Sequence, residues 1–291
     1  MFLDNLINGL SLGSIYAIIA LGYTMVYGIA KMLNFAHGDV IMVGGYMAFC
    51  GLQYWGVPTV LSLVIAMAVC TVLGVTIEGL AYRPLRQAPG LAVLITAIGM
   101  SYLLQNLALM IWGANPKSFP TTFINGSSIR LGSLNISSAT VYTILANVII
   151  MVLLTLFTSR TRMGKAMRCV SQDRGAAQLM GINVNRTITV TFAIGSALAA
   201  IAGVLLCSSY PILQPTTGSM PGIKAFTAAV FGGIGSIPGA MLGGVLLGVI
   251  EIFGKAYIST ELGDAIVFAV LIVVLLVRPT GLLGKAVREK V

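Results

Sequence analysis

The stretch Ser159-Arg-Thr-Arg-Met-Gly-Lys-Ala-Met-Arg-Cys-Val-Ser-Gln-Asp-Arg174 lies between two apolar runs that are each long enough to cross a membrane. Extended to Arg186, it carries six basic residues against the single acid Asp173, a formal charge of +5 in a chain of +9. A short loop this basic stays on the cytoplasmic side, because Lys and Arg resist translocation. We therefore expect residues 159–186, called the basic segment below, to be cytoplasmic and to fix the orientation of the whole chain.

The composition predicts an all-α polytopic membrane protein with one transmembrane domain over residues 1–291. Hydrophobic residues make up 57% of the chain and charged residues only 9%, which is more apolar surface than a soluble core hides. The apolar runs are continuous, whereas a β-barrel needs alternating ones. The basic residues lie in loops between spans, so they indicate orientation in the lipid bilayer and no nucleic-acid partner. Because Cys70 and Cys207 lie in apolar runs, no disulfide framework is expected.

About eight apolar segments are expected to enter the membrane. They are residues 6–30, 40–54, 59–81, 91–112, 140–158, 188–207, 223–252 and 262–277. The second segment is short, so it forms either a full span or a half-helix. The N-terminus lies outside in the first case and inside in the second.

The segment 223–252 is interrupted by Phe231-Gly-Gly-Ile-Gly-Ser-Ile-Pro-Gly239. The C-terminus carries Arg278, Lys285, Arg288 and Lys290 and is expected inside, as is the basic segment. The number of crossings between them is therefore even. The interrupted segment should then enter and leave on the same side as a re-entrant pair of half-helices, a place where transport paths are often found. Residues 251–264 carry three acids and suit an outer loop.

No enzymatic motif is present. His37 is the sole histidine, and the chain has no His-Glu-x-x-His, Gly-x-Ser-x-Gly or Walker A sequence. We therefore expect no catalysis, no metal and no cofactor on this chain. His37 either gates a path or ends a helix with a satisfied hydrogen bond, and we favour the second interpretation. Glu78 is either an ion site or a structural partner of Arg83, and again we favour the structural role. Without a second buried acid or a buried base on another span, an ion-coupled carrier has little to work with.

The basic segment has two interpretations. It is either a solvated loop that touches anionic lipid headgroups, or a docking surface for another protein. Residues 163–171 and 175–180 can each form a short helix, with Asp173 as the N-cap of the second helix. Gly181 follows at the position where a helix ends. Two short helices at the cytoplasmic face favour the docking surface.

The sequence from Gly164-Lys-Ala-Met-Arg-Cys-Val-Ser-Gln-Asp-Arg-Gly-Ala-Ala-Gln-Leu-Met-Gly to Val184 resembles the coupling region of ABC importer permeases for branched-chain amino acids. Ala176-Ala177-x-x-x-Gly181 resembles their Glu-Ala-Ala-x-x-x-Gly signature, although Gly175 stands where the glutamate usually is. Three further stretches are similar to the shorter, H-type member of the paired permeases: Asn8–Gly28, Leu33–Asp39 and Phe231–Ala240. The resemblance covers nearly the whole chain.

The resemblance implies the ABC importer permease fold in a bacterial cytoplasmic (inner) membrane. It implies four kinds of partner: a second, M-type permease subunit, two cytoplasmic ATPases that bind ATP and magnesium, an extracytoplasmic amino-acid-binding protein, and the lipid bilayer. The cargo would be leucine, isoleucine and valine, on a nearly uncharged path. A permease for urea or short amides would share these stretches. A secondary transporter, which needs no ATPase, is the alternative from another class.

The resemblance also assigns residues to roles. ATPase coupling falls on Gly164, Lys165, Met167, Arg168, Gln172, Asp173, Arg174, Ala176, Ala177 and Gly181. The translocation path falls on Asn34, Phe35, His37, Gly38, Gly232, Gly233, Gly235 and Pro238.

Overall fold

The computed structural model describes residues 2–120, 129–131 and 134–284. Its helices are α1 (Phe2–Ala30), α2 (His37–Gln53), α3 (Thr59–Ile77) with a π-helical turn η1 (Glu78–Tyr82), α4 (Gly90–Trp112), α5 (Ser138–Arg160), α6 (Arg162–Gln172), α7 (Arg174–Leu179), α8 (Val184–Ser209), α9 (Ser219–Gly232), α10 (Ile237–Tyr257) and α11 (Gly263–Val277). Short strands β1 (Lys117–Ser118) and β4 (Ile212–Leu213) pair antiparallel, as do β2 (Ile129–Leu131) and β3 (Leu134–Ile136). The predicted all-α membrane fold is confirmed.

Six helices in the described part of the chain are long and apolar enough to cross a membrane: α1, α3 with η1, α4, α5, α8 and α10. Helices α2 and α11 are shorter, with 17 and 15 residues. Together they account for the eight predicted segments, if α9 and α10 are counted as the interrupted one. Lys285, Arg288 and Lys290, which supported the predicted side of the C-terminus, lie outside the described residues.

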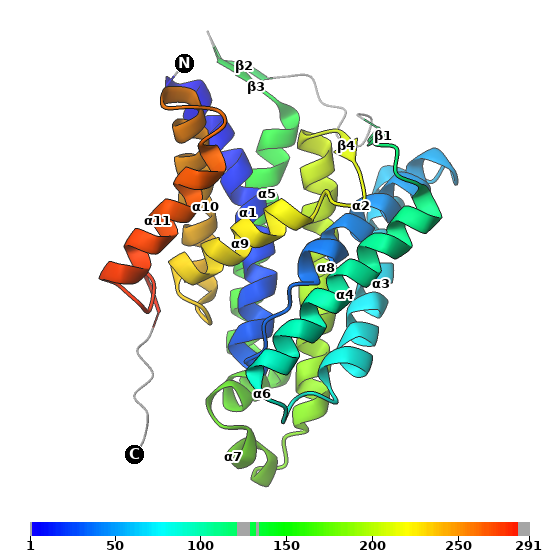
Figure 1. The fold of residues 1–291 in the computed structure, drawn as a ribbon, viewed down its shortest axis with the longest axis vertical. Coiled ribbons are helices and arrows are strands. Elements are labelled where there is room, and N and C mark those ends of the chain that lie inside the picture. The colour runs from blue at the N-terminus through cyan, green and yellow to red at the C-terminus, as the bar shows by residue number, and fades with distance from the viewer. Residues whose placement is uncertain (1, 121–128, 132–133, 285–291) are drawn as a thin grey trace.

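The order of the helices in space places the N-terminus at the end opposite α6 and α7. The N-terminus lies at one end of the molecule, and α6 and α7 lie at the other (Figure 1). Helix α2 leads back toward the end that holds the N-terminus. Their charge predicts that α6 and α7 are cytoplasmic, and the N-terminus is then expected outside, which is the alternative in which α2 crosses.

The interrupted segment is only partly a pair of half-helices. Helix α9 descends from the outer end and α10 returns to it (Figure 1), so the predicted entry and exit on the same side is confirmed. Helix α9 has 14 residues, as a half-helix would, but α10 has 21 and is long enough to span. The prediction was wrong for α10 because its glycines, which include Gly243 and Gly248, serve close packing and do not end the helix.

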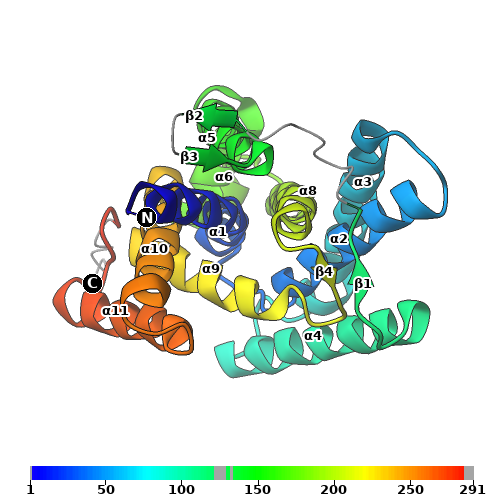
Figure 2. The ribbon, with the colours of Figure 1, turned by 90° about the horizontal axis from the view of Figure 1, so that it is seen from above.

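Helix α1 is the centre of the fold. It is almost wholly buried and is surrounded by α5, α8, α9 and α10 (Figure 2). Two glycines in its first half pack on α10: a Cβ at Gly13 would lie 2.7 Å from the Cα of Val245, and Gly9 faces Val249. Apolar lipid gives little hydrophobic drive for helix pairing, so such backbone contact holds membrane helices together. In contrast, α4 lies on the rim with much of its surface exposed.

Candidate coupling surface and transport path

Local hydrogen bonds define the two short helices of the basic segment. Thr161 caps α6 by accepting from the Gly164 amide at 3.0 Å, and Asp173 caps α7 by accepting from the Ala176 amide at 3.0 Å. Gly181 follows α7 with φ of +80°, which favours glycine. The predicted two helices, the Asp173 cap and the Gly181 stop are therefore confirmed.

The residues assigned to ATPase coupling divide into an anchoring set and an exposed set. Gly164, Met167 and Ala177 are buried, and a Cβ at Gly164 would collide with the backbone of Phe157 and Thr158 in α5. These three fix α6 and α7 to the spans. The exposed set is Lys165, Arg168, Gln172, Asp173, Ala176 and Gly181, and Arg174 is half-buried.

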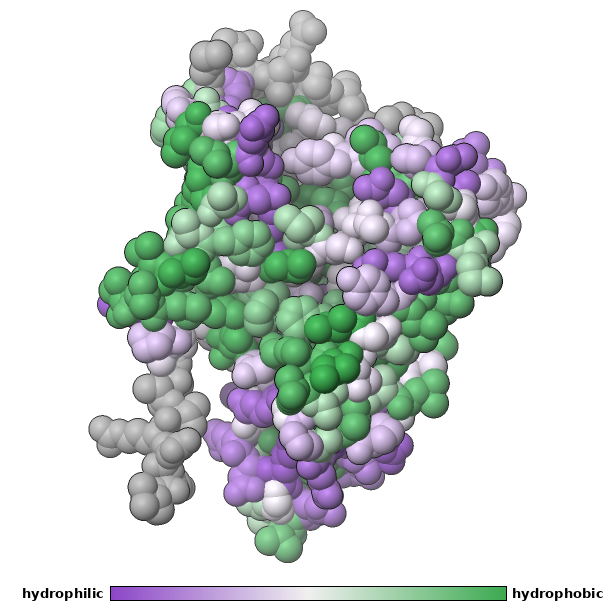
Figure 3. Space-filling view, viewed as in Figure 1, coloured by the Kyte–Doolittle hydropathy of each residue, from purple (hydrophilic) through white to green (hydrophobic). Residues whose placement is uncertain are grey.

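Two apolar side chains at the end of α7 were missed from the sequence. Leu179 is 90% exposed and Met180 is 82% exposed. Figure 3 shows a small hydrophobic patch in a largely hydrophilic region at the end of the molecule where α7 lies. Paired large apolar residues directly before a helix-ending glycine are a signal that could have found them. We call Leu179 and Met180 the apolar tip.

Arginine side chains tie the basic segment to the spans. Arg168 donates from Nε to the carbonyl of Thr158 in α5 at 2.9 Å. Arg174 donates to the carbonyl of Ala30, the last residue of α1. Partial burial, together with the neighbouring Arg86 guanidinium, lowers the pKa of Arg174 from its ordinary value.

Glu78 is structural, as favoured from the sequence, but its partner is Arg86 and not Arg83. The Arg86 guanidinium pairs with Glu78 and also donates to Asn185. Thr189 in α8 donates to the other Glu78 oxygen at 2.8 Å. The helix widens into the π-helical turn η1 at Glu78, and the chain turns after it. This turn brings Arg86, the more distant of the two arginines, back to the Glu78 carboxylate. The network joins α3 to α8.

The predicted path residues between α1 and α2 meet α9. Tyr82 donates from its hydroxyl to Oδ1 of Asn34 at 3.0 Å. The Phe35 ring lies 5.9 Å from the ring of Phe226 in α9, centroid to centroid. Gly38 lets the backbones of α2 and α9 touch, since a Cβ at Gly222 would lie 2.9 Å from the Gly38 Cα. The turn η1 and the helices α2 and α9 therefore meet at Asn34–Gly38.

His37 begins α2, so the prediction that it stands at a helix end is confirmed. The expected hydrogen bond is also present, to the backbone of Ile19, but the expected position at the interface is wrong. The side chain is fully buried, its ring lies 4.6 Å from that of Tyr23, and Nε2 has no hydrogen-bond partner among the described residues. The imidazole can be buried because Gly22 has no side chain, which leaves the space that the ring fills.

The glycine-rich break lies at the C-terminal end of α9. Gly233 and Gly235 adopt φ of +105° and +93° between α9 and α10, and Pro238 follows in the first turn of α10. The amides of Leu282 and Leu283 donate to the carbonyls of Phe231 and Gly232 at 2.9 and 3.0 Å. The break thus packs on the C-terminal segment, and the structure does not bring it into contact with Asn34–Gly38.

A buried ionic cluster, also missed from the sequence, joins α1, α9, α10 and α11. Lys224 pairs with Glu251 at 2.8 Å and with Asp264 at 2.6 Å. Glu251 also accepts from Lys255 and from the Tyr16 hydroxyl, the latter at 2.8 Å. Glu251 lies inside α10, so its assignment to an outer loop was wrong. The expectation of no second buried acid and no buried base was wrong too.

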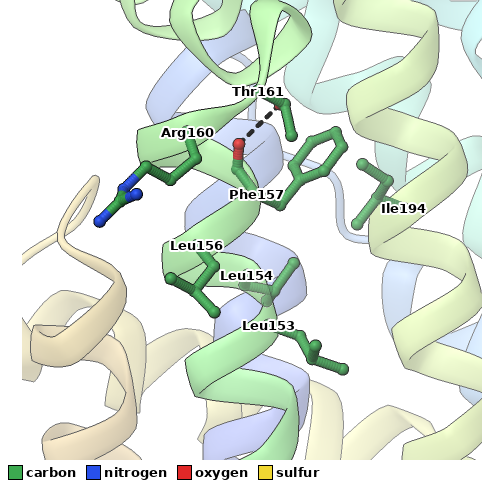
Figure 4. A pocket seen from close by; sticks show the side chains of 7 residues that line it. All are labelled: Leu153, Leu154, Leu156, Phe157, Arg160, Thr161 and Ile194. Atoms are coloured by element: carbon green, nitrogen blue, oxygen red, sulfur yellow. Dashed lines mark hydrogen bonds between the residues drawn. The ribbon is translucent and has the colours of Figure 1, made fainter.

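A shallow hollow on the outside of α5 has a volume of about 560 Å³. Its lining is Leu153, Leu154, Leu156, Phe157, Arg160, Thr161 and Ile194. Phe157 of α5 and Ile194 of α8 face each other, while Arg160 points away from them (Figure 4). None of the predicted path residues lines it.

Comparison with known proteins decides the family. A family described as "branched-chain amino acid transport system / permease component" matches residues 5–275. The chain belongs to this family. It is 48% identical to the high-affinity branched-chain amino acid transport system permease protein LivH of Salmonella typhimurium, over 100% of this chain and 98% of that protein. It is 47% identical, with the same coverage, to the corresponding protein BraD of Pseudomonas aeruginosa.

A solved structure shows that this permease shares its fold with a distant protein. The likeness is to PsaBC from Streptococcus pneumoniae in complex with Fab, with a TM-score of 0.50 and 15% identity. It covers 94% of this chain and 91% of the other. At that identity it supports the arrangement of the helices alone.

Proposed function

We propose that this chain is the H-type permease subunit of an ATP-driven importer that carries leucine, isoleucine and valine across a bacterial inner membrane. The observation that carries the proposal is the near-50% identity, over full length, to permeases named for this transport. The chain is a multi-pass membrane permease, and the two short helices α6 and α7 support the proposal because they offer an exposed surface for ATPases. Urea or a short amide is the cargo to be tested against it.

The proposed assembly has a second, M-type permease, two cytoplasmic ATPases and an extracytoplasmic binding protein. The ATPases bind ATP and magnesium and perform the hydrolysis, so this chain catalyses nothing. Their docking site is the exposed set on α6 and α7 together with the apolar tip. Large apolar side chains surrounded by a polar rim are typical anchors of protein interfaces.

Force passes from that surface to the spans by two routes. Gly164 and Met167 join α6 to α5, and Arg174 joins α7 to the end of α1. The end of α1 leads directly into Asn34–Gly38. A movement of α7 therefore reaches the segment proposed to line the path. The other class of transporter, which needs no ATPase, is disfavoured because the chain belongs to the family of branched-chain amino acid transport system permease components.

The test is uptake of labelled leucine into proteoliposomes that contain this chain, its M-type partner and the ATPases. We expect accumulation that needs both ATP and the binding protein. Replacing ATP by a non-hydrolysable analogue is the matched control. Accumulation of urea in place of leucine would change the cargo, and leucine uptake without any ATPase would overturn the proposal.

A further inference from the structure

One buried carboxylate in the membrane has no cation. Asp39, Glu78 and Glu251 are each at most 2% exposed. Glu78 and Glu251 form ion pairs, whereas among the described residues Asp39 forms none, and its partners are neutral. An unpaired charge is costly to bury, so an ionisable side chain in this state is by default a functional one.

The Gln105 amide can give up its hydrogen bond to Asp39 and still have other partners. Nε2 of Gln105 in α4 donates to Oδ1 of Asp39 at 2.9 Å. The same Nε2 lies 3.2 Å from Oγ of Ser101 and 3.3 Å from Oγ of Ser219 at the start of α9. If another donor replaces Gln105 at the Asp39 carboxylate, the Gln105 amide still has two acceptors, the hydroxyls of Ser101 and Ser219. It is therefore not left buried without a hydrogen-bond partner.

Aromatic side chains stand beside this carboxylate. The Tyr23 hydroxyl lies within electrostatic range of Asp39, and its ring lies 5.7 Å from that of Phe226. Phe226 in turn contacts Phe35. An anion next to an apolar, aromatic wall matches a small molecule with an ammonium group and a branched hydrocarbon chain.

The helix that covers Asp39 packs on the rest of the chain through few residues. Of the residues of α4, only Val93, Ala97, Leu104 and Ala108 are buried. Helix α4 lies on the rim of the molecule (Figure 2), whereas α2 and α9 pack backbone to backbone at Gly38. Movement of α4 can therefore open the Asp39 carboxylate without disturbing the core.

We propose that Asp39 binds the α-ammonium group of the amino acid while it crosses the permease. The ammonium displaces Nε2 of Gln105, which moves to Ser101 and Ser219. The competing amide keeps the binding weak, so release stays fast. The inference rests on the proposed function. It differs from the expected, nearly uncharged path in that one charged residue, Asp39, belongs to the path.

Two probes separate the ammonium from the rest of the cargo. 3-Methylbutylamine has the branched chain and an ammonium group at pH 7, and 4-methylpentanoate has a similar chain with a carboxylate. Binding of each to the purified permease–ATPase complex, without binding protein, is measured by equilibrium titration. The amine should bind and the carboxylate should not. Asp39→Asn should weaken amine binding roughly tenfold or more, the effect of losing one charged hydrogen bond.

Variants make the result decisive. Asp39→Glu should keep binding, and Gln105→Leu should strengthen it by removing the competing donor. Asp264→Asn is the matched control, because it makes the same change in a carboxylate of the ionic cluster, and should bind as the wild type does. If Asp39→Asn binds the amine like the wild type, the proposal is wrong. It is equally wrong if Asp39→Asn takes up leucine with an unchanged KM.

Transport separates this inference from the proposed function. In proteoliposomes, Asp39→Asn should lose leucine uptake but keep ATP hydrolysis stimulated by the binding protein. Equal loss of both would mark a purely structural residue and overturn the inference. If the wild-type complex itself fails to accumulate leucine, the proposed function fails, and the amine titration still reports on Asp39. If the Asp39→Asn permease does not assemble with its partners, the Gln105→Leu variant provides the test. Amine binding by Gln105→Leu that is no tighter than binding by the wild type overturns the inference.

Discussion

The Arg174 guanidinium, in the first residue of α7, donates a hydrogen bond to the backbone carbonyl of Ala30, the last residue of α1. The two residues are 144 positions apart in the chain. Carbonyls at a helix C-terminus lack partners within the helix and carry partial negative charge, so a cation is favourable there. The contact joins the C-terminus of the central helix to α7, which belongs to the proposed docking surface.

Replacing Arg174 by Gln should uncouple transport from ATP hydrolysis. The shorter, neutral side chain cannot hold the end of α1, so α7 would move without carrying the Asn34–Gly38 segment. We expect leucine transported per ATP to fall several-fold while hydrolysis persists. Arg162→Gln is the control, since Arg162 is exposed on α6. An unchanged ratio for Arg174→Gln would show that this contact does not transmit movement.

The apolar tip should be an anchor for the ATPases. Replacing Leu179 and Met180 together by Ser removes two side chains that only a partner could bury. Anchor residues of this kind contribute about 2 kcal/mol or more each, so the loss of both should lower ATPase affinity roughly a thousandfold. The measurement is titration of the ATPases onto the permease in detergent, with the exposed Gln178→Ala as control. Equal affinity for both variants would place docking elsewhere.

Features set by neighbours in the chain could be predicted from the sequence. The α6 and α7 helices end where Asp173 and Gly181 stand, because caps and glycine stops act over three or four residues. The spans followed from apolar length, and the four-residue spacing of Gly9 and Gly13 is typical of the close helix contact that they make.

Features set by distant parts of the chain could not. Lys224 and Glu251 are the two charged residues of the run 223–252, but their pairing depends on how α9 folds back along α10. Which arginine returns to Glu78 depends on the bend after η1. The exposure of the apolar tip contradicts the usual rule that large apolar residues in a helix are buried.

Replacing Gly13 by Ala should destabilise the contact between α1 and α10. The new Cβ would meet the backbone of Val245, which cannot rotate away as a side chain can. Overpacking of this kind costs about 1–3 kcal/mol, and should lower the melting temperature of the purified permease. Gly99→Ala is the matched control, because a Cβ at Gly99 meets nothing within 4 Å. Equal melting temperatures of the two variants would show that the helices can separate at little cost.

Changes in the ionic cluster should destabilise the permease in a fixed order. Glu251→Gln leaves Lys224 and Lys255 without the carboxylate they share, and breaking a buried pair costs about 3–5 kcal/mol. Lys224→Met should cost less, because Glu251 keeps Lys255 and Tyr16. Asp264→Asn should cost least, since its side chain is 47% exposed and solvent screens the pair. Thermal unfolding of the purified variants gives the order directly. If Asp264→Asn melted below Glu251→Gln, the cluster would be held together from α11 and not from the buried carboxylate of α10.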